Sequence, residues 1–191
     1  MFVPPALQAP PAPDAPPAWW RERGAHGLEA LGEAFFARLG TPYIAETYYA
    51  DAEALRRQGI RGRAAVWEAL AKGRVASACR LRFLVSLSAD RRRAFFSKSL
   101  ARTWPGAGFS LARKDVQAFL GLVCRLSEPG DRQEYLFLPE RGAWVRMGQE
   151  APVHLPAGPL VEAIRTIEWE EDGENPGVMA RLLQGYADRL P

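Results

Sequence analysis

The sequence is poor in the residues from which metal sites and disulfide frameworks are built. It contains two cysteines, Cys79 and Cys124, and two histidines, His26 and His154, and none of them has the spacing of a zinc-ligand pair. We therefore expect no metal ion and no cofactor. Two cysteines are also too few for a disulfide-rich framework. We interpret them as buried thiols that pack as small apolar groups, and the sequence leaves open whether they are bonded.

The motifs that identify most catalytic and nucleotide-binding sites are missing as well. The sequence has no G-x-S-x-G nucleophile motif, no P-loop and no glycine-rich dinucleotide fingerprint after a strand. The acidic residues between positions 168 and 174 do not have the spacing of an EF-hand loop, and we interpret them as a solvated connection. Catalytic residues are therefore unknown at this stage.

Long apolar runs and clustered charge are absent too. No stretch approaches the roughly 20 apolar residues of a membrane-spanning helix, and residues 1–5 lack the basic and apolar regions of a signal peptide. We expect a soluble protein with no transmembrane segment. The sequence leaves its localisation unknown: cytoplasmic, or periplasmic if a signal has been removed. The net charge is +3 and the arginines are scattered, which favours a solvated surface and no nucleic-acid partner.

Proline is abundant, and it is concentrated at one end. Seven of the sixteen prolines lie within residues 1–17. Because proline removes backbone donors and favours extended chain, we predict a disordered tail over residues 1–17 and a single domain over residues 18–191. Such a tail is alternatively a polyproline ligand for a protein partner.

Hydrophobic periodicity predicts an α+β domain. We predict strands at 31–39, 43–50, 76–87, 134–138 and 143–147, and helices at 51–59, 62–72, 89–104 and 159–169, with one helix capped by Ser110 and a last one after Asn175. Hairpins predominate and no regular βαβ alternation occurs. This order indicates a curved antiparallel β-sheet with helices layered on one face.

Several of these segments together resemble the chalcone isomerase superfamily, in particular its bacterial chalcone isomerase-like branch. Residues 31–40 with 43–50 resemble its opening hairpin, residues 80–91 its central strand running into a helix, and residues 130–145 its late hairpin; 160–169 and 178–183 resemble its closing helices. The resemblance implies a ligand cleft between the sheet and the helical layer. It also implies one of two functions, because some members cyclise chalcones and others bind fatty acids without catalysis, holding the carboxylate with an arginine and a tyrosine.

The sequence departs from the family at the expected arginine of the first strand, where Phe35 stands. Arg38 follows three residues later, and an odd shift places a strand residue on the other face. Tyr43 matches the tyrosine of the fatty-acid-binding members. From the resemblance and the aromatic strand pattern, the predicted ligand-binding residues are Arg38, Tyr43, Thr47, Phe83, Phe95, Phe96 and Arg102.

Three functions remain open. The missing catalytic arginine favours a non-catalytic protein that binds a small apolar or amphipathic ligand, such as a fatty acid. The first alternative is an isomerase or lyase-type enzyme that acts on an enone or chalcone-like substrate through Tyr43 or Thr47. The second is a protein-interaction module that uses the Pro-rich tail and the adjoining Trp19-Trp20.

Overall fold

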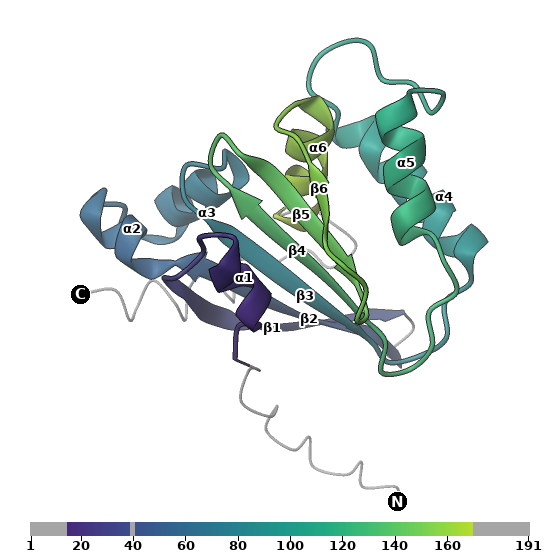
Figure 1. The fold of residues 1–191 in the computed structure, drawn as a ribbon, viewed down its shortest axis with the longest axis horizontal. Coiled ribbons are helices and arrows are strands. Elements are labelled where there is room, and N and C mark those ends of the chain that lie inside the picture. The colour runs from purple at the N-terminus through teal and green to yellow at the C-terminus, as the bar shows by residue number, and fades with distance from the viewer. Residues whose placement is uncertain (1–14, 39–40, 170–191) are drawn as a thin grey trace, which may run out of the picture.

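The computed structural model describes residues 15–38 and 41–169 (Figure 1). Six strands form one antiparallel sheet in which every strand pairs with its neighbours in the chain, in the order β1-β2-β3-β4-β5-β6. The strands are β1 (Leu28–Arg38), β2 (Thr41–Asp51), β3 (Ser77–Phe83), β4 (Arg132–Leu138), β5 (Gly142–Met147) and β6 (Val153–Leu155). The α+β class with an antiparallel sheet, predicted from the sequence, is confirmed.

Helices cover this sheet mainly from one side (Figure 1). They are α1 (Ala18–Glu22), α2 (Ala52–Arg57), α3 (Arg63–Ala71), α4 (Ala89–Thr103), α5 (Lys114–Val123) and α6 (Pro159–Glu168). Helices α2 to α6 contribute their apolar side chains to one large core with the sheet. None of the helices described is long and apolar enough to cross a membrane.

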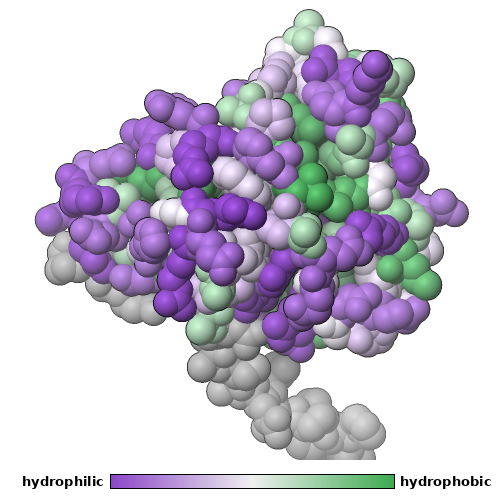
Figure 2. Space-filling model, viewed as in Figure 1, coloured by the Kyte–Doolittle hydropathy of each residue, from purple (hydrophilic) through white to green (hydrophobic). Residues whose placement is uncertain are grey.

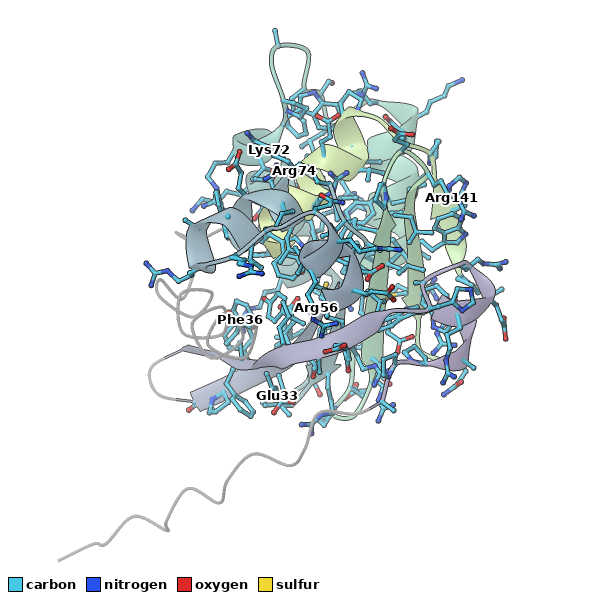
Figure 3. All side chains as sticks on the ribbon, turned by 90° about the vertical axis from the view of Figure 1, so that its left-hand side faces the viewer. Glu33, Phe36, Arg56, Lys72, Arg74 and Arg141 are labelled. Atoms are coloured by element: carbon cyan, nitrogen blue, oxygen red, sulfur yellow. The ribbon has the colours of Figure 1, made fainter. Side chains whose placement is uncertain are left out.

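Alternation along the strands gives the sheet two different faces. The inner face lies toward α2–α6. One of its rungs consists of Tyr48, Cys79 and Tyr135, which are cross-strand neighbours on β2, β3 and β4. The outer face carries the intervening residues, such as Arg80 and Glu134, which also pair across strands. On β1, Figure 3 shows Glu33 and Phe36 extending from opposite sides of the strand, as their odd spacing requires.

The outer face is covered by α1, a short helix that the sequence did not predict. Its residues Trp19 and Trp20 are buried in a second apolar cluster with Tyr49, Leu136 and Trp144. Glu134 accepts hydrogen bonds from Trp19 Nε1 at 3.0 Å and Arg80 Nε at 2.8 Å, and Arg146 Nε donates to it at 2.7 Å. One helix therefore lies opposite the main helical layer, and a buried carboxylate fastens it to the sheet.

Several sequence-based boundaries need correction. Ser88 caps α4 as predicted, since its hydroxyl accepts from Arg91 N, but Ser110 does not cap α5, whose N-cap residue is Arg113. The strand predicted at 76–87 is shorter and ends at Phe83. Strand β6, which contains His154, was not predicted. Most of the Pro-rich segment and the helix predicted after Asn175 lie outside the described residues.

Replacing Gly142 by alanine is expected to destabilise the protein by more than about 2 kcal/mol. Gly142 has φ +87°, which disfavours other residues by about 1–2 kcal/mol. An added Cβ would also lie 2.2 Å from the Leu155 carbonyl oxygen and 2.7 Å from Ala157 N, so β6 would have to move. Urea unfolding measures the loss. Gly130→Ala is the matched control, with φ +95° and nothing within 4 Å; equal losses in both variants would disprove the role of the close contact.

Candidate functional site

Between the inner face of the sheet and the helices, the mainly apolar core contains, in addition to buried serines, a group of seven buried polar side chains. We call them the buried polar row: Glu46, Tyr48, Cys79, Arg92, Gln133, Tyr135 and Glu168. Burying so many polar groups costs free energy unless they hydrogen-bond or bind something. The row is therefore the candidate functional site.

The strand register explains why these residues meet. Tyr48, Cys79 and Tyr135 form one cross-strand rung of β2, β3 and β4. The next inner rung contains Glu46, Leu81 and Gln133. Five members of the row therefore come from two adjacent rungs, and helices α4 and α6 add Arg92 and Glu168 from above.

The basic end of the row is built around Arg92, which is only 5% exposed. Its Nη1 donates to the Ser127 hydroxyl and its Nη2 to Gln133 Oε1. The guanidinium also lies over the Phe83 ring, with Cζ 4.6 Å from the ring centroid. A guanidinium has five N–H donors, so these two bonds leave capacity for a further acceptor.

Arg92 forms no ion pair with any carboxylate in the part of the chain that the structure describes. Burial lowers its pKa, while Tyr135, Cys124 and Asp131 oppose that change from a distance and Arg125 adds to it. A buried cation without an opposite charge beside it carries a desolvation cost of several kcal/mol. This makes Arg92 the strongest candidate in the fold for holding an anionic group.

Tyr135 connects the two ends of the row. Gln133 Nε2 donates to its hydroxyl oxygen, so the tyrosine's own proton remains to be donated. Burial raises its pKa well above the usual value, the acidic groups Glu168 and Cys79 raise it further, and Arg92 lowers it. The phenol therefore stays neutral at physiological pH and acts as a hydrogen-bond donor.

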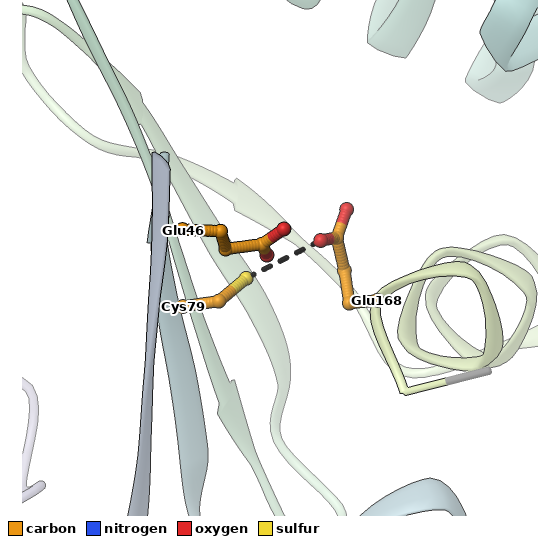
Figure 4. Close-up of side chains that lie close together, drawn as sticks. All are labelled: Glu46, Cys79 and Glu168. Carbon is orange, nitrogen blue, oxygen red and sulfur yellow. Dashed lines mark hydrogen bonds between the residues drawn. The ribbon is translucent and has the colours of Figure 1, made fainter. Parts of the chain in front are cut away.

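The acidic end consists of Glu46, Cys79 and Glu168, whose side chains converge between the sheet and α6 (Figure 4). One ligand-type atom from each lies within 4.8 Å of the other two. The Cys79 thiol donates to Glu168 Oε2 at 3.5 Å. The Oε1 atom of Glu46 is buried without a hydrogen-bond partner.

Two tryptophans hold Glu168 in this position. Glu168 is the last residue of α6, and Trp169 follows it. Trp67 Nε1 on α3 donates to the Trp169 carbonyl oxygen at 2.6 Å, and the Trp169 ring lies 5.2 Å from the ring of Tyr48. The end of α6 is thus fixed to both α3 and the sheet, and Glu168 points inward.

Burial dominates the titration of the acidic end. It raises the pKa of Glu168 well above the usual range, and the negative charge of Glu46 raises it further. Burial also raises the pKa of Glu46, although hydrogen bonds from Glu168 and Tyr48 oppose this. Burial raises the pKa of the Cys79 thiol as well. Both glutamates thus hold a proton to higher pH than usual, and a hydrogen bond joins Glu168 to Glu46.

These raised pKa values predict that stability falls as pH rises above about 4.5, the ordinary value of a glutamate. In this range the folded protein holds protons that the unfolded chain has released, so the contribution is full below pH 4.5 and lost as pH passes the folded pKa. The free energy of unfolding, measured with urea, should therefore be lower at pH 8 than at pH 5.

Glu168→Gln should flatten this pH dependence, because the amide does not titrate. The carboxylates of Asp115 and Glu150, whose arginine partners lower their pKa, act in the opposite direction only at lower pH. An unchanged slope in the Gln variant would contradict the assignment to Glu168.

Only part of the predicted ligand-binding set lies at the buried polar row. Phe83 lies beneath Arg92, and Phe96 is buried in the core with its ring 5.4 Å from Phe119. Phe95, 5.2 Å from Phe96, is 39% exposed. Phe83 thus contacts the row at Arg92, and Phe96 lies on the buried side of α4 one turn after Arg92.

The other four lie elsewhere. Thr47 is on the outer face, paired with Arg80. Tyr43 lies beyond the last β2–β3 pair, with the Arg91 guanidinium 5.7 Å from its ring centroid. Arg102 is exposed in the last turn of α4. Arg38 ends β1 opposite Thr41, and its side chain is outside what the structure describes. Their part in ligand binding stays a prediction.

Apolar side chains also reach the surface of the molecule. Figure 2 shows hydrophobic side chains gathered at the centre of the visible face, between the positions of α6 and α5 in Figure 1.

Both free cysteines are buried, as the sequence predicted.

No known family model matches the chain, and no curated protein matches its sequence. Among solved structures, a fatty-acid binding protein of Arabidopsis thaliana is similar, with a TM-score of 0.67 and 17% sequence identity. The match covers 86% of this chain and 90% of that one. At this identity the likeness shows the fold alone: the chain has a chalcone isomerase-like α+β fold, as the sequence resemblance predicted.

Proposed function

We propose that the protein binds a fatty acid, or a similar amphipathic carboxylate, between the inner face of the sheet and helices α4–α6, without transforming it. The observation that carries this proposal is Arg92, a buried cation with no ion-pair partner among the described residues. A ligand carboxylate supplies the missing negative charge.

The carboxylate would accept hydrogen bonds from Arg92 and from the Tyr135 hydroxyl. Guanidinium–carboxylate bonds are charge-assisted and about twice as strong as neutral ones. Tyr135 is fixed by Gln133, which also accepts from Arg92. The three side chains therefore form a continuous, preorganised set of donors and supports for an anion.

The alkyl chain would follow the buried side of α4. Phe96 and Leu100 lie one and two turns after Arg92 on the same helix, and all three are buried. Phe83 adds a ring below the guanidinium. An amphipathic ligand with its head at Arg92 would thus place its tail against apolar side chains, toward the hydrophobic surface of Figure 2.

The comparison supports the same reading. The similar Arabidopsis protein is described as a fatty-acid binding protein. We further propose, from the segments at 31–50, 80–91 and 130–145, that the chain belongs to the bacterial branch of the superfamily. Docking of a partner through residues 1–17 stays a separate proposal, because most of that segment lies outside the described residues.

Calorimetric titration with hexadecanoic acid and with its methyl ester tests the proposal. The two ligands share a tail and differ in the charge that Arg92 would hold. We expect one acid molecule per chain and binding of the ester weaker by about tenfold or more, since hydrogen bonds to charged groups contribute about 1.5–3 kcal/mol. Equal binding of acid and ester, or binding of neither, would refute the proposal.

A further inference from the structure

We propose that Glu46, Cys79 and Glu168 form a binding site for one divalent transition-metal ion, and zinc fits the ligand set best. This goes beyond the proposed function, since the three residues lie at the end of the buried polar row opposite Arg92. They come from β2, β3 and α6. Their separation in the chain explains why no metal-ligand spacing is visible in the sequence.

The geometry suits a metal ion. The three ligand atoms lie within 4.8 Å of one another, and Figure 4 shows the two carboxyl groups and the thiol directed toward a common point. A tetrahedral zinc ion with bonds of about 2.3 Å to sulfur and about 2.0 Å to oxygen separates those two ligands by about 3.5 Å. The observed distance from Cys79 Sγ to Glu168 Oε2 is 3.5 Å.

A second observation points to a missing ligand. Glu46 is 3% exposed, yet its Oε1 atom has no hydrogen-bond partner. An unsatisfied buried carboxyl oxygen costs about 1–3 kcal/mol or more. A metal ion at the cluster would take that oxygen as a ligand.

The chemistry of the set selects the kind of metal. A thiolate ligand disfavours hard cations such as Mg²⁺ and Ca²⁺ and favours zinc and its neighbours in the first transition row. Three protein ligands leave a fourth position for water or a small ligand atom, as in open zinc sites. Tyr48 hydrogen-bonds to Glu46 and would orient it from the outer shell.

The charge of the three ligands also favours binding of a divalent metal ion. Zinc binds cysteine as the thiolate and glutamate as the carboxylate, so any protons on these three groups are released to solvent on binding. The three deprotonated groups carry three negative charges, which a divalent ion reduces to one. A fully ionised site without metal would be far more costly at this depth, so metal affinity should rise with pH.

Zinc and cobalt titrations of the chelator-stripped full chain, without fatty acid, test the site. We expect one Zn²⁺ per chain, a higher melting temperature with zinc, and a near-ultraviolet thiolate-to-Co²⁺ absorption when Co²⁺ is the probe. Cys79→Ser should abolish that absorption, and Cys124→Ser, the matched change at the other buried free thiol, should retain it.

A second variant, Glu46→Gln, tests the metal site independently in case the Cys79→Ser protein does not fold. The amide keeps the size of the side chain and should leave the metal-free melting temperature within a few degrees of the parent. Zinc affinity should fall by more than about tenfold. Changing a residue that only hydrogen-bonds to a metal ligand already costs about that much, and Glu46 is proposed as a ligand itself. Three results would each overturn the metal site: no stoichiometric zinc binding, zinc affinity unchanged in Glu46→Gln, or thiolate absorption that persists in Cys79→Ser. Each would leave the Arg92 proposal untouched.

Discussion

Replacing Arg92 by methionine is expected to weaken fatty-acid binding by about 10- to 100-fold. The change removes the cation that would hold the carboxylate but keeps an unbranched apolar side chain over Phe83. Charge-assisted hydrogen bonds contribute about 1.5–3 kcal/mol, which corresponds to this range of affinity. Calorimetric titration with hexadecanoic acid measures the change.

Stability should respond quite differently in the same variant. Arg92→Met loses hydrogen bonds to Ser127 and Gln133, but it also removes a buried charge that has no ion pair. These effects oppose each other, so the free energy of unfolding should change by no more than about 2 kcal/mol. Arg93→Met, at the exposed neighbouring position, is the control and should bind as the parent does. A stable Arg92→Met variant with full affinity would place the carboxylate elsewhere.

Replacing Glu134 by glutamine is expected to destabilise the protein by about 3–5 kcal/mol, the usual cost of breaking a buried ion pair. Glu134 is 2% exposed and lies between Arg80 and Arg146, with N–O distances of 2.8 Å and 2.6 Å. The variant keeps the shape but removes the negative charge between two guanidinium groups. It also weakens the bond from Trp19 Nε1 that fastens α1.

Urea unfolding of Glu134→Gln and of the double variant Arg80→Met, Glu134→Leu separates charge from packing. Replacing Arg80 and Glu134 together by apolar residues should recover much of the lost stability, because the buried guanidinium leaves with the carboxylate, while Arg146 keeps a partly exposed side chain. A loss below about 1 kcal/mol in the single variant would show that the network contributes little. Fatty-acid affinity should not change in either folded variant, since Glu134 faces away from Arg92.

The sheet was predictable because its strands carry a strong local signal. The alternation through Cys79, Leu81 and Phe83 identified the inner face of β3, and the structure places these residues there. The short elements were not predicted, because they lack such a local signal. The five residues of α1 and three of β6 are held by distant contacts, such as Trp19 with Glu134 and His154 Nε2 with the Arg141 carbonyl.

The basic end of the site was visible in the sequence but was not recognised. In the helix predicted at 89–104, Phe96, Leu100 and Trp104 recur at intervals of four as an apolar stripe, and continuing that stripe back by four residues reaches Arg92. An arginine at a core position of a helix is rare unless it has a partner. That position was a better indicator of an anion site than the family position near Phe35, which is 40% exposed.

The acidic end could not be assembled from the sequence alone. Glu46 alternates with Tyr48 in one strand, and Cys79 lies on the predicted core face of another, but nothing local joins them to Glu168. That residue was interpreted as part of a solvated acidic run. Its burial depends on Trp67 and Trp169, which fix the end of α6 against α3 and the sheet.

A carbon-13 NMR spectrum of carboxyl-labelled hexadecanoic acid, bound to the full chain, tests most directly whether a buried arginine holds the carboxylate. We predict a single bound carboxyl resonance, at the position of an ionised group, which does not titrate between pH 5 and pH 8 because Arg92 stabilises the charge. In Arg92→Met the bound resonance should weaken and should titrate as free acid does, and in Arg93→Met it should be unchanged. A bound resonance that titrates as free acid does in the parent protein, or one unchanged in Arg92→Met, would contradict the proposed site.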